Sequence, residues 1–434
     1  MMQSINNTQT SRPHTHGRLI INARVASLDP THTQPYGMLD NHAVLIGDDK
    51  IMWVGPSSEV NPKQFEGNLI DAAGRLLTPG LIDSHTHLIY GGNRAQEFEA
   101  RQQGQSYEQI ARAGGGILST VRATRELYQS GLIEQALPRL TALCREGVTT
   151  VEIKSGYGLT LDDELKMLRA ARQLEQLLPV RIRTTLLAAH AVPPEYRDNA
   201  DGYIDMICQQ LMPKVVEEGL ADAVDVFCES IAFSPAQCRR VFEAAKQHGL
   251  GIKGHTEQLS NLGGSALAAE FGAWSVDHLE YLDDDGIKAM RSAGTVACLL
   301  PGAFYFLKET QMPPIEALRQ AGVPMALASD CNPGSSPLAS LRLMMNQGCV
   351  LFGLTPEEAL TGVTRHAAKA LGLSRQVGMI RPGQQADLLL WDLDHPAQLA
   401  YEFGPDRLAL RIFNGQPASI HHAQHSLSSL ASHG

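Results

Sequence analysis

Residues 76–88 read LLTPGLIDSHTHL, an apolar run that ends in two histidines, His85 and His87. In a β-strand, side chains two residues apart point the same way, so a strand here would set both imidazoles side by side. The apolar residues before the pair indicate that this strand is buried. A buried pair of neutral imidazoles needs a partner for its lone pairs. The spacing alone is weak evidence for a metal site, because His14 and His16 repeat it in the polar N-terminal stretch.

Outward from this run, short apolar stretches alternate with longer amphipathic ones. The stretches 161–178 and 234–249 have apolar residues at helical spacing, and Ser234 with Pro235 is a typical helix start. This alternation predicts an α/β fold, a (β/α)₈ TIM-like barrel over residues 79–377. The candidate strands are LLTPGLIDSHTHL, VTTVEIKSG, RIRTTLLAAHA, AVDVFCES, LGIKGHTE, WSVDHLEY, TVACLLP and VPMALASD.

Both ends of the chain have a different, β-rich texture. RLIINARVASLD and HAVLIGDDKIMWVG contain strand-like runs with a Gly47-Asp48-Asp49 turn, and ADLLLWDLD and LALRIFNGQ near the C-terminus are similar. We therefore expect a composite β-sandwich domain made of residues 18–78 and 378–434. Residues 1–17 are polar without a hydrophobic period, which predicts a disordered tail.

Composition excludes several classes of function. The net charge is −10 and no dense Lys/Arg block occurs, which argues against nucleic acid or an anionic membrane as a partner. We find no apolar run of membrane-spanning length and no secretory signal, so the expected location is cytoplasmic. The seven cysteines are scattered without a C-x-x-C pair and are expected to be reduced thiols.

Further histidines and an aspartate collect where candidate strands end: His190, His255, His278 and Asp330. In a barrel these ends converge on one face, where chemistry takes place. Histidine and aspartate ligands suit zinc or iron with a position left for water, whose pKa the metal lowers. Any one of these residues alone would more often be a hydrogen-bonded core histidine or a capping aspartate. Their coincidence at strand ends favours a metal-dependent hydrolase.

Two distant stretches, TPGLIDSHTH and GQQADLLLWD, resemble the amidohydrolase superfamily. Within it, the chain is similar to the imidazolonepropionase family in the stretches HTHLIYGGNR, RAGGGILSTVRATREL, EIKSGYGL, AAHAVPPEY, GHTEQLSNLGG, DHLEY and SDCNPGSSP. The resemblance implies hydrolysis of the ring C–N bond of 4-imidazolone-5-propanoate to N-formimidoyl-L-glutamate in histidine degradation. It also implies one Zn²⁺ or Fe³⁺ per subunit and a homodimer as a candidate assembly.

The resemblance also assigns residues by position. It implies that Asp330 accepts a proton as well as binding metal, and that His278 stands by the attacking water. The implied metal ligands are His85, His87, His255 and Asp330. The residues implied to contact substrate or product are Arg94, Tyr157, His190, Gln258, Asn332, Gly334 and Ser335.

These roles are chemically reasonable, although each has a plainer alternative. Arg94 can meet the propanoate with a bidentate fork, or be a solvated surface arginine. Tyr157 and the loop from Asn332 to Ser335 can bind substrate or be ordinary turns, and His190 can hydrogen-bond the ring or be a core histidine. Some family members have Glu where this chain has Gln258. Glutamine cannot serve as a general base, which leaves the proton to Asp330 and His278.

Two features invite other interpretations. By position, Lys154 resembles the carboxylated lysine that bridges two metals in dinuclear amidohydrolases, but we expect a single metal with Lys154 as a polar wall residue. The glycines 114–116 lack a phosphate-loop pattern and are expected to form a loop near the pocket mouth. The alternatives for the whole protein are an amidohydrolase that deaminates or opens another small heterocycle, and a barrel scaffold without catalysis.

Overall fold

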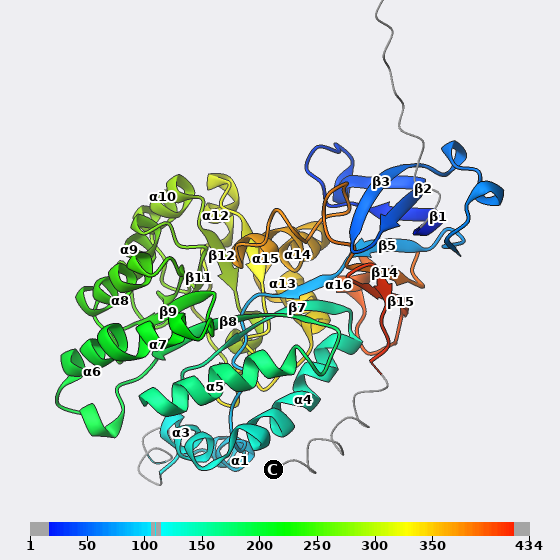
Figure 1. The fold of residues 1–434 in the computed structure, drawn as a ribbon. Helices are drawn as coiled ribbons and strands as arrows, with labels where there is room; N and C mark the ends of the chain where they lie inside the picture. Colours follow the sequence, from blue (N-terminus) through cyan, green and yellow to red (C-terminus); the bar gives the residue numbers. More distant parts are fainter. Residues whose placement is uncertain (1–16, 106–108, 110–113, 421–434) are drawn as a thin grey trace, which may run out of the picture.

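The structure, a computed structural model, describes residues 17–105, 109 and 114–420 (Figure 1). The expected disordered tail therefore lies outside the described residues, apart from Gly17. Two sheets organise the molecule, and each has eight strands. One forms the barrel, and the other is a mixed sheet at one side of it.

The barrel sheet is parallel throughout and follows chain order from β6 to β13. This arrangement confirms the predicted (β/α)₈ fold class. Its strands are β6 (Leu81–Asp83), β7 (Val148–Lys154), β8 (Arg181–Ala189), β9 (Ala223–Cys228), β10 (Gly251–Thr256), β11 (Ser275–His278), β12 (Val296–Leu299) and β13 (Met325–Leu327).

Backbone contacts just beyond β6 and β13 close this sheet into a barrel. Thr86 and Cys331 form a parallel bridge. His87 N–H donates to Cys331 O at 3.0 Å, and Asp330 N–H donates to His85 O at 2.9 Å. Closure therefore runs through the segments that contain three of the four predicted ligands, His85, His87 and Asp330.

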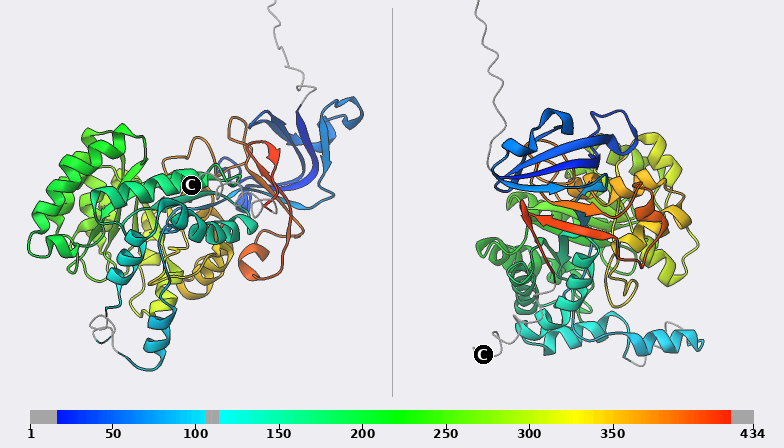
Figure 2. Two further views of the ribbon diagram at one scale, coloured as in Figure 1. Left: turned by 60° about the horizontal axis from the view of Figure 1, so that its bottom comes forward. Right: turned by 90° about the vertical axis from the view of Figure 1, so that its right-hand side faces the viewer.

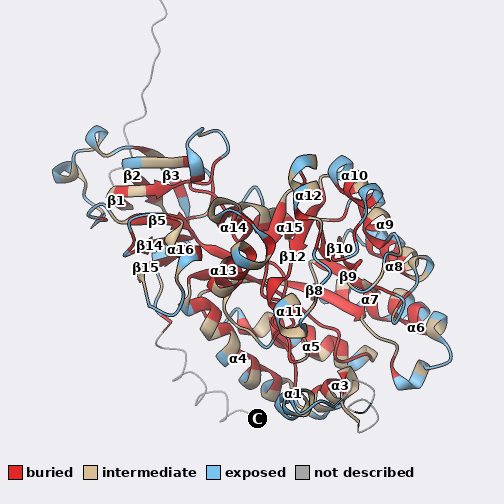
Figure 3. Cartoon of the chain, turned by 180° about the vertical axis from the view of Figure 1, so that it is seen from behind, coloured by how far each residue is buried: buried red, intermediate tan, exposed pale blue. Residues whose placement is uncertain are grey.

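Helices cover the outside of the barrel and leave its strands buried (Figure 3). Helix α8 has the predicted cap: Ser234 accepts from Gln237 N–H in a capping box, with Pro235 in the first turn. The main helices are α1 (Ala95–Gln102), α3 (Ile117–Glu126), α4 (Gln129–Arg145), α5 (Leu161–Leu174), α6 (Ala200–Met206), α7 (Met212–Glu217), α8 (Pro235–Gln247), α9 (Gly264–Glu270), α10 (Asp284–Ala293), α11 (Pro301–Leu307), α12 (Ile315–Ala321), α13 (Leu341–Phe352), α14 (Pro356–Gly362), α15 (Arg365–Ala370) and α16 (Gln398–Tyr401).

The second sheet joins both ends of the chain, as Figure 2 shows from the side. Antiparallel pairing of β14 with β5 links its C-terminal strands to its N-terminal ones. We propose that this domain meets the barrel near Gly80 and again near residue 377, as the sequence predicts. Its strands are β1 (Arg18–Ala26), β2 (Met38–Gly47), β3 (Lys50–Pro56), β4 (Asn68–Asp71), β5 (Leu76–Pro79), β14 (Leu388–Trp391), β15 (Leu408–Phe413) and β16 (Gln416–Pro417).

The prediction of one strand over residues 76–88 is wrong in detail. The run serves both sheets, as β5 in the mixed sheet and β6 in the barrel. The chain changes sheets at Gly80, whose N–H donates to Asp387 O at 2.8 Å. A Cβ at Gly80 would lie 2.1 Å from Thr149 Oγ1, so only glycine fits this crossing. His85 and His87 consequently lie just past β6 rather than within a strand.

Buried polar contacts join the mixed sheet to the barrel. The Arg411 guanidinium donates to Val148 O and Pro179 O at 3.0 and 2.7 Å. Trp391 of β14 is fully buried: its indole N–H donates to Thr78 Oγ1 of the neighbouring strand β5 at 2.9 Å, and its ring belongs to the hydrophobic cluster of the barrel. The mixed sheet therefore packs directly against the start of the barrel through buried contacts.

All seven cysteines lie in the described part of the chain and are free. Among the described helices, none combines the length and the apolar character needed to cross a bilayer.

Truncation of Trp391 to alanine tests the contribution of this junction. We expect the free energy of unfolding to fall by about 3–5 kcal/mol, because a large buried ring leaves a cavity. Urea unfolding followed by circular dichroism measures the loss. Tyr128→Ala is the control, since its side chain is 86% exposed and its removal should change stability by less than about 0.5 kcal/mol. Equal losses of unfolding free energy in both variants would contradict a stabilising role of Trp391 at this junction.

Candidate active site

Three histidines and one aspartate bring their ligand atoms together at the C-terminal end of the barrel. His85 Nε2 and His87 Nε2 lie 3.3 Å apart, and His255 Nε2 lies 3.4 Å from His87 Nε2. Asp330 Oδ1 is 3.4 Å from Nε2 of both His85 and His87. All four residues are buried. The sequence predicted these four as metal ligands, and the structure places them side by side.

The spacing of these atoms fits a single metal ion. Four ligands at about 2.1 Å in a tetrahedron lie about 3.4 Å from one another, which matches the four distances given above. Buried carboxylates also fix the ring nitrogens. Asp277 Oδ2 accepts from His85 Nδ1 at 2.6 Å, and Asp225 Oδ1 accepts from His255 Nδ1 at 3.1 Å. Because each Nδ1 then carries the hydrogen, each Nε2 lone pair is available to a metal.

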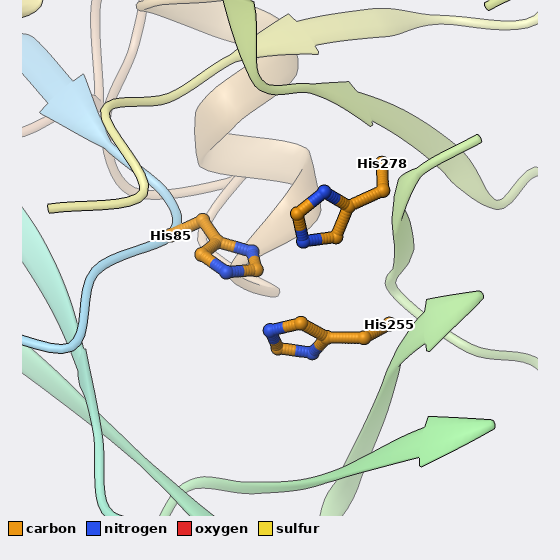
Figure 4. A group of neighbouring side chains, drawn as sticks. All are labelled: His85, His255 and His278. Atoms are coloured by element: carbon orange, nitrogen blue, oxygen red, sulfur yellow. The ribbon is translucent and has the colours of Figure 1, made fainter. Parts of the chain in front are cut away.

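His278 lies beside this group without being needed to complete it. Figure 4 shows the rings of His85, His255 and His278 facing one another. The His278 ring centroid is 5.3 Å from that of His255, and His278 Nδ1 has no hydrogen-bond partner among the described residues. Burial lowers the pKa of His278 to about 4, so its ring is neutral at pH 7. A neutral ring with a free polar atom can hydrogen-bond a ligand or water.

The backbone is strained at this face. His278 and Asp330 have φ values of +84° and +49°, although neither is glycine. Such left-handed residues cost about 1–3 kcal/mol each and gather at functional sites because the surrounding fold enforces them. Here the strain turns both side chains towards the same space.

A fully buried network of charged side chains lies directly beneath the histidines. Lys154 Nζ donates to Glu152 Oε1 and Asp225 Oδ2, both at 2.7 Å. Lys253 Nζ donates to Ser275 Oγ at 2.8 Å and lies 3.7 Å from Asp277 Oδ2. Burial alone would lower the pKa of Lys154, but Asp225 and Glu152 raise it above its ordinary value. The two lysines thus stabilise the ionised form of Asp277 and Asp225, the carboxylates that orient His85 and His255.

These contacts place Lys154 in a different role from a bridging ligand. Its Nζ is fully buried and already bonded to two carboxylates. Lys154 does not line the cavity, so it is a member of the buried charge network rather than the polar wall residue that the sequence predicted.

A cavity of about 510 Å³ opens over the ligand group. Every residue that the sequence predicted for the site lines it except His85, which lies behind the others. The predicted residues in its lining are His87, Arg94, Tyr157, His190, His255, Gln258, His278, Asp330, Asn332, Gly334 and Ser335.

Arg94 reaches the cavity from the start of α1, held by an acid that the sequence did not indicate. Arg94 Nε and Nη2 donate to Glu97 Oε2 at 2.8 and 2.7 Å. The third nitrogen, Nη1, faces Gly334, where an added Cβ would lie 2.3 Å away. Glycine at 334 therefore leaves room for the guanidinium. Arg94 is accordingly a positioned cation rather than a solvated surface arginine.

The loop from Asn332 to Ser335 is more self-contained than expected. Asn332 Oδ1 accepts from the N–H groups of Gly334 and Ser335, both at 2.8 Å. Asn332 Nδ2 donates to Asp330 O at 2.7 Å. The backbone N–H groups of Gly334 and Ser335 are thus already hydrogen-bonded within the loop. For the backbone of this loop, the alternative of an ordinary turn therefore applies. The Ser335 hydroxyl lies 3.5 Å from Asp330 Oδ2.

His190 and Tyr157 form the wall opposite. His190 Nδ1 donates to Gly156 O at 2.9 Å, which leaves Nε2 as an acceptor. Burial, reinforced by His87, lowers the pKa of His190 to about 4, so the ring is neutral at pH 7. Burial also raises the pKa of Tyr157, which remains a phenol. His190 can therefore accept a ring N–H but cannot protonate a ring nitrogen near neutral pH.

Gln258 lines the cavity, whereas its neighbour Glu257 turns away from it. Glu257 accepts from the N–H groups of Gly264 and Ser265 at 2.8 and 2.9 Å, which gives it a structural role at the start of α9. The Gln258 N–H donates to Glu229 Oε1 at 2.7 Å.

Sequence reasoning missed the supporting acids Asp225, Asp277 and Glu97. A signal existed for the first two: each is a lone carboxylate inside an apolar candidate strand, where only a buried partner explains it. Glu97 had no comparable signal, since it lies on a polar helix without buried residues. The cavity wall also contains Arg101, Phe227, Ile231 and Leu259, which no local pattern indicated.

Comparison with known proteins matches the geometry. Residues 76–418 match the amidohydrolase family. The chain is 61% identical to an imidazolonepropionase from Chromobacterium violaceum over 409 residues, covering 94% of this chain and 99% of that protein. It is also 61% identical to an imidazolonepropionase from Hahella chejuensis over 396 residues, covering 91% and 98% of the two chains.

Solved structures of more distant proteins share the fold. An adenosine deaminase from Xanthomonas campestris with bound zinc superposes with a TM-score of 0.66 at 19% identity, covering 96% of this chain and 98% of that one. A triazine hydrolase variant gives 0.67 at 18% identity, covering 95% and 99%.

Removal of a ligand side chain tests the metal site. His85→Ala should reduce bound metal to less than about a tenth of the wild-type content, because the site loses one of its four donors. Elemental analysis of purified protein measures it. Ser335→Ala, which changes the same cavity without removing a proposed ligand, should keep its metal. Unchanged metal content in His85→Ala would exclude His85 as a ligand.

Asp277→Asn tests the supporting carboxylate. We expect metal affinity to fall about 10- to 100-fold, because His85 loses the charge that orients its ring. Competition with a chelator gives the affinity. Asp222→Asn is the matched control: Asp222 precedes β9, at the other end of the barrel strands, and pairs there with Arg172 and Arg183. An equal loss in both variants would point to general destabilisation.

Proposed function

The chain belongs to the imidazolonepropionase family of the amidohydrolases, and on that premise we propose how the residues of this cavity open the substrate ring. The protein is a hydrolase of histidine degradation. It hydrolyses the ring C–N bond of 4-imidazolone-5-propanoate and yields N-formimidoyl-L-glutamate. The observation that carries the proposal is a cation for the acidic tail, Arg94, in the same cavity as the four-ligand group.

Amidohydrolases are metal-dependent, and the described residues hold a matching cluster. We propose one Zn²⁺ or Fe³⁺ per subunit, held by His85, His87, His255 and Asp330. When bound, such an ion supplies Lewis acidity and activates water at neutral pH. The single-metal proposal is supported by Lys154, whose Nζ is bonded to carboxylates and is not available as a bridging ligand.

The proton is handled by Asp330. Hydrolysis adds a hydroxyl group to the ring carbonyl carbon and a hydrogen to the leaving ring nitrogen. Asp330 would take the proton from water and return it to that nitrogen as the C–N bond breaks. Gln258 has no proton to exchange near pH 7, which leaves this work to Asp330. His278, neutral and with a free Nδ1, would hold the attacking water by a hydrogen bond.

The remaining cavity residues would orient the substrate. His190 Nε2 would accept the ring N–H, since its Nδ1 hydrogen is used by Gly156 O. The Tyr157 phenol and the Gln258 amide would hydrogen-bond the polar edge of the ring, and Asn332, Gly334 and Ser335 would border the product. Arg94 would bind the propanoate through Nη1 and the second hydrogen of Nη2, because Glu97 takes the Nε hydrogen and one hydrogen of Nη2.

The alternatives fit less well. A deaminase of a neutral purine or triazine has no acidic tail for Arg94 to bind. A non-catalytic scaffold would have no need of buried, oriented ligands. The identities of about 61% to imidazolonepropionases also favour ring opening.

We further propose a cytoplasmic location, where the free cysteines would stay reduced. A homodimer belongs to the same proposal. Val350, Tyr401 and Phe403 are exposed on or beside the adjoining helices α13 and α16 and offer an apolar surface for a second copy.

The function is tested by supplying fresh 4-imidazolone-5-propanoate to purified protein. Ring absorbance should fall while N-formimidoyl-L-glutamate appears by mass spectrometry, and metal content is measured on the same sample. Turnover by metal-free protein, or its absence in fully loaded protein, would contradict the proposal.

Arg94→Ala tests the recognition of the tail. We expect KM for 4-imidazolone-5-propanoate to rise roughly 10- to 100-fold, because a charge-assisted hydrogen bond is lost. Steady-state kinetics measures the change. Arg240→Ala, on the exposed face of α8, should leave KM unaltered. An unchanged KM in Arg94→Ala would favour a neutral heterocycle as the substrate.

A further inference from the structure

A second arginine, Arg101, lines the substrate cavity and has no role in the mechanism above. It lies in the last turn of α1, the helix that Arg94 caps. Over the described residues, its guanidinium forms no hydrogen bond or ion pair. This contrasts with Arg94, whose guanidinium is bonded to Glu97.

An aromatic ring holds Arg101 in place of a carboxylate. Its guanidinium carbon lies 5.2 Å from the centroid of Phe306 on α11. Phe306 in turn stacks on Phe98 of α1 at 5.3 Å between centroids. A cation over an aromatic face is attracted by the ring but keeps its N–H donors free. Arg101 is therefore positioned without an ion pair to any described carboxylate.

The charges of this wall are unbalanced. Arg94 and Arg101 are near enough to repel each other, and burial together with Arg94 lowers the pKa of Arg101 below its ordinary value. Of the two carboxylates in the cavity lining, Asp330 faces His85 and His87, and among the described residues Glu97 alone is bonded to an arginine of this wall. A bound anion would supply the second negative charge and relieve the repulsion.

We propose that Arg101 is a second determinant of specificity for the acidic tail, which pairs with the propanoate carboxylate together with Arg94. The inference rests on the proposed function, because it takes the substrate to be a carboxylate. Arg94 has two of its five N–H donors bonded to Glu97, whereas Arg101 offers a whole guanidinium to the same group. Because Arg101 adds its own donors, the cavity can select an anion although Arg94 is already bonded to Glu97.

The alternative for Arg101 is a packing role, in which its stem and its contact with Phe306 stabilise the edge of α1. This reading predicts that its loss weakens every ligand of the cavity alike. The inference predicts a loss confined to ligands that carry a carboxylate.

The experiment compares two competitive inhibitors that differ only in charge, 3-(imidazol-4-yl)propanoate and 3-(imidazol-4-yl)propanamide, on metal-loaded enzyme. Arg101→Met retains most of the side-chain stem and removes the charge. We expect its inhibition constant for the propanoate to rise about tenfold, while that for the amide stays within about twofold. Arg101→Lys should restore part of the affinity. Lys288→Met is the charge-matched control, since Lys288 is exposed on α10.

The outcomes separate the two claims. If wild-type enzyme prefers the propanoate and Arg101→Met loses that preference, the inference is supported. If Arg101→Met weakens both inhibitors equally, or neither, while wild-type enzyme keeps its preference, Arg101 is not a determinant and only the inference falls. If wild-type enzyme does not distinguish the two compounds, the carboxylate substrate is wrong and the inference falls with it.

Discussion

Closure of the barrel between the ends of β6 and β13 is the contact on which the rest of the site depends. Two backbone hydrogen bonds, from His87 N–H to Cys331 O and from Asp330 N–H to His85 O, tie the first strand to the last. They join residues far apart in sequence and set Asp330 Oδ1 at 3.4 Å from two histidine nitrogens. The left-handed backbone of Asp330 is the conformational cost of that placement.

Burying the charged groups beneath the site is unfavourable, and pairing of opposite charges in the barrel interior offsets this cost. Isolated buried ions would be strongly unfavourable, but Lys154 and Lys253 lie among Glu152, Asp225 and Asp277. Breaking such a network by removing one partner costs about 3–5 kcal/mol, so its members hold one another in place. Because Asp225 and Asp277 also orient His255 and His85, the stability of the core and the readiness of the site for metal depend on the same contacts.

Much of this arrangement could be predicted from sequence. Alternating strands and helices gave the fold class, and strand-end residues such as His255 and Asp330 gave a group that the structure assembles. The contacts that sequence could not supply are those set by three-dimensional proximity. Gly80 is required where the apolar run changes sheets, because Thr149 leaves no room for a Cβ there. Glu97 contributes to the site because it accepts hydrogen bonds from Arg94. Arg101 has no local signature, since its proposed role comes from its contact with Phe306 and from the absence of an ion pair to any described carboxylate.

One metal ion, held where the barrel closes, is expected to suffice for ring opening. The most direct measurement is a titration of metal-free enzyme with zinc or iron, following turnover of 4-imidazolone-5-propanoate at each addition. Activity should rise linearly and reach its plateau at one equivalent per chain. A plateau at two equivalents, or full activity before any metal is added, would contradict the account.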